Sequence, residues 1–223
     1  MTRVSEWFDQ TWEFVRPALP AVPATVIEIG CGSLGGLVPR LRSVGYDATG
    51  VDPNAPDEPG YEHVEFERLP AAQADAIVAC TSLHHVADLD AALDRLASSL
   101  VPGGALIVVE MAWERYDERT ARWCFSQVAD DDDSWIRHQR DEFAESGRPW
   151  QVYRGAWAAE AALHTGTEVL DGLDERFGLV SKAYGPYFFG DLTTVTYAQE
   201  QSAIEAGQIT AVGIRYLATS RSA

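Results

Sequence analysis

The chain has 223 residues, 34 acidic and 17 basic, which give a formal net charge of -17. Such an excess of negative charge opposes binding to DNA, RNA and anionic membranes, because those partners attract basic surfaces. A hydrophobic share of 46% and an aromatic share of 10% are typical of a folded domain and exclude a disordered chain.

The first ten residues, MTRVSEWFDQ, carry acids and lack the basic and then apolar pattern of a signal peptide. No apolar run approaches the length that spans a membrane. We therefore expect a cytoplasmic protein that binds neither membranes nor nucleic acid. Three cysteines lack metal-ligand spacing, so we expect them to be reduced and expect no metal site.

The first half of the chain alternates strand-like and helix-like segments, an order typical of a mostly parallel sheet with crossover helices. Trp7, Phe8, Trp12 and Val15 share one helical face and predict a lead-in helix that ends before Pro17. The elements expected next are a strand at 24–29, a helix ending near residue 45, strands at 47–52, 63–67 and 75–80, a helix at 88–100, a tight turn at 101–104 and a strand at 105–110.

Residues 113–178 change in character and read as helices rich in tryptophan. Five of the seven tryptophans lie between 113 and 157, and two interpretations stay open for them: core residues, or walls of a small-molecule pocket. The acidic run Asp130–Asp133 is interpreted as a solvated loop. Thr165 and Glu168 have the spacing of a capping box. The elements expected afterwards are a strand at 179–189, a helix at 197–206 and a strand at 213–220.

The stretch VIEIGCGSLGGLV, residues 26–38, places Gly30, Gly32 and Gly35 in a G-x-G-x-x-G turn between a strand and a helix. Such a turn brings backbone N–H groups close to a nucleotide-like ligand. Glu28 lies where nicotinamide-binding folds have an apolar residue, and a carboxylate there favours a cationic adenosyl amino acid over a pyrophosphate. Asp52, at the end of the second strand, can accept hydrogen bonds from ribose hydroxyls of either ligand.

Five short motifs follow in a fixed order and together resemble the class I S-adenosylmethionine-dependent methyltransferases, with most likeness to the small-molecule branch typified by quinone-biosynthesis enzymes. The resemblance covers about residues 20 to 112. It implies an α/β fold with a doubly wound, mostly parallel, seven-stranded Rossmann-like sheet and a helical cap inserted after the fifth strand. The motifs are EIGCG at 28–32, VDP at 51–53, FERLP at 66–70, DAIVACTSLHHV at 75–86 and VPGGAL at 101–106.

On this resemblance we expect a single methyltransferase domain over residues 1–223. Its predicted parts are an N-terminal helix at 1–23, a cofactor-binding core at 24–112, a helical substrate cap at 113–178 and closing strands at 179–223.

The resemblance also implies a cofactor, S-adenosylmethionine, which leaves as S-adenosylhomocysteine. It places the glycine turn beside the methionine portion, Asp52 on the ribose, Phe66 and Glu67 beside the adenine, and Thr81 near the amino group. One position departs from the family pattern, because Leu34 stands where a third glycine is usual, with Gly35 and Gly36 after it. The predicted cofactor-binding residues are Glu28, Gly30, Cys31, Gly32, Asp52, Pro53, Phe66, Glu67 and Thr81.

His84 and His85 follow the fourth strand at its carboxyl end, where ligands bind in open parallel sheets. They are the predicted catalytic residues, since histidine suits a general base, and a purely structural role for the pair stays open. Glu110, Trp113 and Tyr187 are the predicted substrate-binding residues. For Glu110 the alternative is a hydrogen-bonded structural acid, and for Tyr187 it is a place in the core.

The function predicted from these features is in-line transfer of a methyl group to a small, apolar or aromatic metabolite. Two alternatives stay open: an NAD-dependent oxidoreductase, which the G-x-G-x-x-G turn and Asp52 also fit, and a non-catalytic relative that binds the cofactor or a protein partner. The acceptor atom is left open, as is the choice between monomer and homodimer.

Overall fold

A seven-stranded sheet lies at the centre of the computed structural model, which describes residues 3–69, 73–130 and 132–221. The strand order is β3-β2-β1-β4-β5-β7-β6, and β7 runs antiparallel to both of its neighbours while the other strands are parallel. This confirms the predicted mostly parallel, doubly wound sheet. The strands are β1 (Thr25–Ile29), β2 (Asp47–Val51), β3 (Tyr61–Glu62), β4 (Ala74–Cys80), β5 (Leu100–Met111), β6 (Phe177–Gly185) and β7 (Gly213–Ser220).

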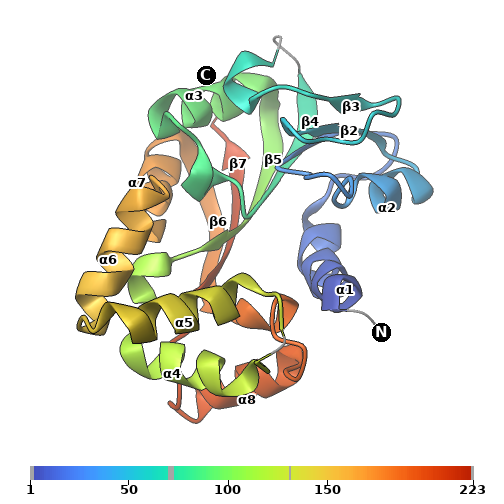
Figure 1. The fold of residues 1–223 in the computed structure, drawn as a ribbon. Helices are drawn as coiled ribbons and strands as arrows, with labels where there is room; N and C mark the ends of the chain where they lie inside the picture. The colour runs from blue at the N-terminus through green and yellow to red at the C-terminus, as the bar shows by residue number, and fades with distance from the viewer. Residues whose placement is uncertain (1–2, 70–72, 131, 222–223) are drawn as a thin grey trace.

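Helices cover both faces of the sheet, with α1 and α2 on one side and α3 and α7 on the other (Figure 1). Neighbouring residues of β4 therefore pack in different cores: Val78 packs with α1 and α2, and Ile77 packs with α3 and α7. Burial on both faces explains the continuous apolar run of this strand. Among the described residues, no helix is long and apolar enough to cross a membrane. These four helices are α1 (Arg3–Val15), α2 (Val38–Ser43), α3 (Leu89–Ser99) and α7 (Gly166–Arg176).

The remaining helices form a cap next to the end of β5 (Figure 1). Met111, the last residue of β5, packs in the core of this cap with Tyr116 and Trp150. Trp150 is fully buried, and its indole N–H donates to the Tyr116 carbonyl at 2.7 Å. Trp135 and Trp157 instead stack on each other beside a cavity, so the cap tryptophans serve both as core and as wall. The cap helices are α4 (Glu118–Gln127), α5 (Trp135–Ser146), α6 (Trp150–Glu160) and α8 (Tyr197–Glu205).

Helix α7 falls inside the range predicted as cap but packs on the sheet, through Val169, Leu170 and Leu173. It begins at the predicted capping box, in which the Thr165 side chain accepts from the Glu168 N–H and the Glu168 carboxylate accepts from the Thr165 N–H.

The strand predicted at 63–67 is wrong. Strand β3 is Tyr61–Glu62, and these two residues pair with Gly50 and Val51, the last two residues of β2. Beyond them β2 offers no further partner, so the chain turns into a 3₁₀ turn at Phe66–Arg68 despite its alternating pattern.

The tight turn predicted at 101–104 is also wrong, because β5 already begins at Leu100. The pairing with β4 moves from Leu100 opposite Ala74 to Ala105 opposite Ala76. The Pro-Gly-Gly segment is therefore an irregularity inside a long strand, where extra residues bulge out of the ladder.

The strand predicted at 179–189 ends early, at Gly185, and a 3₁₀ turn follows at Phe188–Gly190. The buried Glu200 carboxylate accepts hydrogen bonds from the backbone N–H groups of residues 187–189, at 2.8, 3.1 and 2.7 Å. These bonds hold the segment away from the sheet. Burial raises the pKa of Glu200 to about 7, against the opposing effect of its three N–H donors.

Candidate functional site

Three adjoining cavities form one cleft at the carboxyl ends of β1, β2 and β4. The strand cavity, about 250 Å³, lies directly at these strand ends. The helix cavity, about 410 Å³, lies between the glycine turn and Trp7 and Phe8 of α1. The cap cavity, about 560 Å³, is lined mainly by α5 and α6. Thr81 lines the first two cavities, His85 lines the strand and cap cavities, and Tyr187 lines the helix and cap cavities.

The glycine turn is packed closely between the end of β2 and the loop after β4. The Gly30 N–H donates to the Val51 carbonyl at 2.9 Å, and the Gly32 N–H donates to Asp52 Oδ2 at 3.0 Å. Gly30 has a φ of +75°, and a Cβ there would lie 2.5 Å from the Cβ of Ser82. The turn therefore requires glycine at this position, both for backbone conformation and for space.

Glu28 lies beneath the turn and does not appear among the described residues that line the three cavities. It is 1% exposed, and its Oε2 accepts from the Leu37 N–H at 2.7 Å, just before α2. Burial raises the pKa of Glu28 to about 8, although backbone N–H groups of Leu37 and Val38 oppose the shift. Glu28 thus acts on the site through the shape of the turn.

Leu34, the position that departs from the family pattern, is followed by two glycines in the turn. Leu34 is 72% exposed and lines the helix cavity. Gly35 and Gly36 take the left-handed conformation, with φ of +80° and +58°, and a Cβ on Gly36 would overlap the Glu28 carboxylate. The backbone of the turn therefore approaches the Glu28 carboxylate closely at Gly36, two residues after Leu34.

We expect Gly36→Ala to lower the free energy of unfolding by about 3 kcal/mol or more, from left-handed strain of about 1–2 kcal/mol and the clash with a buried carboxylate. Gly147→Ala is the matched control, because Gly147 has a φ of +61° but a Cβ added there would meet nothing within 4 Å. Urea unfolding of both variants measures the difference. Equal losses would contradict the packing of Gly36 against Glu28.

The strand cavity combines an acid with an apolar wall. Asp52 is held by two backbone donors, since its Oδ1 accepts from the Asn54 N–H at 2.7 Å and its Oδ2 from Gly32. Ser82 also lines this cavity, and its buried hydroxyl has no partner within the described part of the chain. The predicted residues that line the strand cavity are Gly30, Asp52, Pro53, Phe66, Glu67, Thr81 and His85; Cys31 and Gly32 line the helix cavity.

Thr81, at the end of β4, is a non-glycine residue with a φ of +49°. Its N–H donates to the Val109 carbonyl at 2.7 Å, which fixes this conformation. Backbone strain of this kind clusters at functional sites, and here it occurs where the strand and helix cavities meet.

His84 and Glu110 form a buried pair at the edge of the cleft, and His84 is among the residues that line the cap cavity. Glu110 is 0% exposed, and the His84 Nδ1–H donates to its Oε2. The other carboxylate oxygen accepts from the N–H groups of Ser82, at 2.8 Å, and Leu83, at 2.6 Å. Burial works against the charged form of His84, yet the charge and hydrogen bond of Glu110 raise its pKa; burial likewise opposes ionisation of Glu110, yet His84 lowers its pKa.

His85 differs from its neighbour in both exposure and charge. It is exposed within the cleft, and its ring centroid lies 4.0 Å from that of His84. Burial of part of the ring and the neighbouring His84 charge lower the pKa of His85, despite the opposite effect of Glu110. His85 is therefore neutral at neutral pH and can accept a proton.

Two of the three predicted substrate-binding residues lie elsewhere than predicted. Both carboxylate oxygens of Glu110 accept hydrogen bonds from His84 or from backbone N–H groups. Glu110 is therefore placed as a hydrogen-bonded structural acid, which was the alternative interpretation. The Trp113 indole N–H donates to the His164 carbonyl at 3.0 Å, and Trp113 is not among the described residues lining the cap cavity. Tyr187 does line that cavity.

A family model for the methyltransferase domain matches residues 4–155. The chain belongs to this methyltransferase domain family. Together with the seven-stranded topology, the match confirms the predicted class I S-adenosylmethionine-dependent methyltransferase. The assignment to a quinone-biosynthesis branch stays a prediction.

Relatives of this methyltransferase match it over part of their length. An uncharacterized methyltransferase of Mycobacterium tuberculosis is 32% identical over 120 residues, covering 45% of this chain and 61% of that protein. A ubiquinone biosynthesis O-methyltransferase of a Bradyrhizobium species is 31% identical over 97 residues, covering 37% of this chain and 38% of that protein. The chain thus spans less than two thirds of the length of either relative.

A solved structure shares the fold of this methyltransferase. Geranyl diphosphate C-methyltransferase of Streptomyces coelicolor, in complex with Mg²⁺, geranyl-S-thiolodiphosphate and S-adenosyl-L-homocysteine, superposes with a TM-score of 0.57 at 14% identity. The superposition covers 95% of this chain and 75% of that one.

The walls of the cap cavity come from residues of the methyltransferase that the sequence did not single out. Richness in tryptophan was the available signal, but it did not separate Trp135 and Trp157, which line the cavity, from the buried Trp150. The other cap residues found only in the structure are Met111, His138, Gln139, Glu142, Glu160, Ala161 and Leu163.

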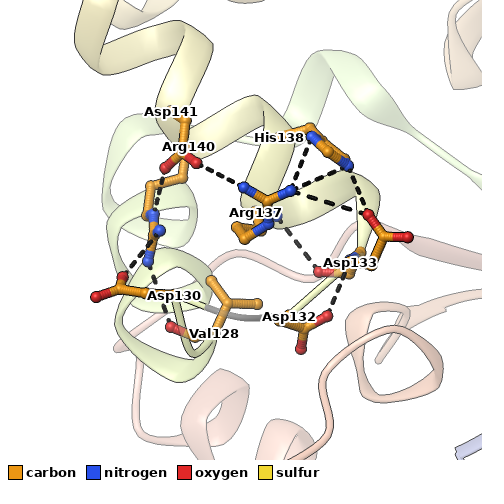
Figure 2. A network of polar contacts seen from close by, with 9 residues as sticks. Val128, Asp130, Asp132, Asp133, Arg137, His138, Arg140 and Asp141 are labelled. Carbon is orange, nitrogen blue, oxygen red and sulfur yellow. Dashed lines mark hydrogen bonds and ion pairs between the residues drawn. The ribbon is translucent and has the colours of Figure 1, made fainter.

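Asp130 and Asp133 of the acidic run are exposed, as predicted, and both also pair with α5 (Figure 2). Asp130 contacts Arg140 at 3.1 Å, and Asp133 contacts His138 at 3.1 Å and Arg137 at 3.9 Å. The run is therefore a partner of the helix that lines the cap cavity; its residue 131 lies outside the described residues.

Proposed function

We propose that this protein transfers a methyl group from S-adenosylmethionine to a small apolar or aromatic metabolite bound in the cap cavity. The observation that carries the proposal is the continuity of the cleft. His85 borders both the strand cavity and the cap cavity, so a cofactor in the first and an acceptor in the second would meet beside it.

The residues of the strand cavity fit the adenosine part of this cofactor. Asp52 offers carboxylate oxygens to ribose hydroxyls, and the Ser82 hydroxyl lacks a partner among the described residues. Phe66 gives an apolar surface suited to a purine. The methionine part would extend past Gly32 into the helix cavity, where a Cβ at Gly32 would meet nothing within 4 Å.

When bound, S-adenosylmethionine supplies a methyl group already activated by a positively charged sulfur. The chain therefore needs to orient the acceptor, exclude water and take up a proton where the acceptor loses one. Trp135, Trp157 and Tyr187 form the walls that exclude water. We assign the proton-accepting role to His85.

Glu110 positions both histidines from outside the cavity, whereas His84 lines the cap cavity beside His85. Glu110 holds the N–H groups of Ser82 and Leu83, and so fixes the loop that carries both histidines. Its carboxylate raises the pKa of His84, while burial and then the His84 charge lower the pKa of His85. The pair thus favours the neutral form of His85, which can accept a proton.

Isothermal calorimetry with S-adenosylmethionine and S-adenosylhomocysteine tests the proposal, and we expect both to bind. Asp52→Asn is expected to weaken S-adenosylhomocysteine by about 10- to 100-fold, since hydrogen bonds to a charged group contribute about 1.5–3 kcal/mol. Asp57→Asn, in the exposed loop after β2, is the control and should bind as the wild type does.

Failure of both compounds to bind the wild-type protein would end the proposal, and binding of NAD instead would favour the oxidoreductase alternative. Tight cofactor binding without transfer to any member of a broad acceptor panel would favour the non-catalytic alternative.

A further inference from the structure

Two carboxylates lie on one wall of the cap cavity. Glu142 of α5 and Glu160 of α6 are both exposed and both line it. The Tyr153 hydroxyl donates to Glu142 Oε2 at 3.0 Å. Burial, then the hydrogen bond and charge of Glu142, and then the charge of Glu160 raise the pKa of Tyr153. The lining of the cap cavity therefore includes two carboxylates.

The arginines of the same helix pair with the acidic run and with Asp141 (Figure 2). Arg137 pairs with Asp141 at 2.9 Å, and Arg140 pairs with Asp130 at 3.1 Å and Asp141 at 2.9 Å. Among the described residues that line the cap cavity there is no lysine or arginine. His84 also lines the cavity and its pKa is raised, but it is paired with the buried Glu110 carboxylate. Neither Glu142 nor Glu160 forms an ion pair with another described residue, so no cation of the lining neutralises these two carboxylates.

Aromatic rings line the same cavity as the two carboxylates. The Trp135 and Trp157 rings stack at a centroid distance of 6.2 Å and an interplanar angle of 12°, and both line it along with Tyr187. Parallel indole faces favour a flat ring, and their negative faces attract a cation. A cavity of about 560 Å³ has room for a metabolite of this kind.

The Gln139 side chain has polar atoms without hydrogen-bond partners among the described residues. It is 2% exposed and lines the cap cavity, and neither its amide nitrogen nor its amide oxygen has a partner within residues 3–69, 73–130 and 132–221. Buried carboxamides are normally paired, so an unpaired one bordering a cavity points to a ligand with polar hydrogens.

We infer that the methyl acceptor is an aromatic amine, a flat ring bearing an alkylammonium group that is positively charged at neutral pH. The ammonium lies against Glu142 and Glu160, and the ring lies against Trp135 and Trp157. Metabolites with carboxylate or phosphate groups in the ammonium's place are disfavoured. This inference rests on the proposed function, because it names the acceptor of the same site.

Three compounds that share an indole ring but differ in charge test the inference. Tryptamine is a cation, tryptophol is neutral and indole-3-acetate is an anion. Each is titrated by calorimetry into the full chain saturated with S-adenosylhomocysteine. We expect tryptamine to bind at least about tenfold more tightly than indole-3-acetate, with tryptophol between them.

Variants locate the charge preference. Glu142→Gln and Glu160→Gln should each weaken tryptamine by about threefold to tenfold and leave tryptophol unchanged. Glu145→Gln, an exposed glutamate of α5 that is not among the lining residues, is the matched control and should change neither.

Equal or tighter binding of indole-3-acetate would overturn the inference, as would failure of all three compounds to bind or a tryptamine affinity unaffected by either variant. Binding of S-adenosylhomocysteine, measured first, separates these outcomes from failure of the proposed function.

Discussion

Replacing Glu110 with glutamine is expected to lower the free energy of unfolding by about 3 kcal/mol or more at mildly acidic pH. Removing one partner of a buried ion pair leaves the other charge uncompensated, at a typical cost of about 3–5 kcal/mol. Glu110 also accepts from the N–H groups of Ser82, Leu83 and Met111, and an amide can satisfy these less well than a carboxylate.

The loss should depend on pH in a defined way. The pKa of Glu110 is lowered from its ordinary value of 4.5, so its stabilisation is present above that value and is lost as pH falls through the lowered pKa. The pKa of His84 is raised from 6.5, so its stabilisation is present below that value and is lost as pH rises through the raised pKa. The deficit of the variant should therefore be greatest between 4.5 and 6.5.

Urea unfolding of the wild type, Glu110→Gln, His84→Gln and the double variant across this range measures both the loss and the coupling of the pair. We expect a coupling energy above about 1 kcal/mol, as for residues in direct contact. A deficit that stays constant with pH, or a coupling near zero, would show that the pair is not ionised in the folded protein.

The central sheet could be predicted because burial on both faces leaves a direct mark in the sequence. Strand β4 reads as an apolar run since Ile77 and Val78 enter different cores. Strand β3 could not be predicted, because its length depends on where β2 ends rather than on its own pattern. Gly103 and Gly104 likewise read as a turn, although they lie in a bulge within β5, between the pairs Leu100–Ala74 and Ala105–Ala76.

The meeting of distant residues at the strand cavity was predictable for a related reason. Parallel strands end at one edge of the sheet, so Asp52 and Thr81, which are distant in sequence, come together at the strand cavity. The unusual acid at Glu28 was correctly expected to need hydrogen-bond donors or a cation, because a buried carboxylate must be compensated. In the structure the donors are backbone N–H groups at the start of α2.

The acceptor side could not be predicted in the same way. Helices α5 and α6 carry aromatic residues on more than one face, and only packing decides that Trp150 is core while Trp135 and Trp157 are wall. The role of the acidic run was hidden as well, because its partners Arg137 and Arg140 are recognisable only once α5 is placed.

Replacing His85 with alanine is expected to lower kcat by about 100- to 10,000-fold for an acceptor that must lose a proton, which is the usual contribution of a positioned base. The fold should be little affected, because His85 is exposed in the cleft and its loop is held by Glu110. Binding of S-adenosylhomocysteine should stay within a few-fold of the wild type.

The pH profile separates a base from a residue that only shapes the pocket. The pKa of His85 is lowered from 6.5, so kcat of the wild type should rise with pH along a limb whose midpoint lies below that value. The His85→Ala variant should lose this limb. The control is His63→Ala, which removes an exposed histidine outside the three cavities and should keep both rate and profile.

Retention of the acid limb in His85→Ala would assign the titration to another group and remove His85 from the role of base. A rate close to that of the wild type would mean that methyl transfer relies on orientation alone, with the proton lost to water. Because the amine inference concerns the ammonium end of the acceptor, at Glu142 and Glu160, it can be tested whichever of these outcomes is found.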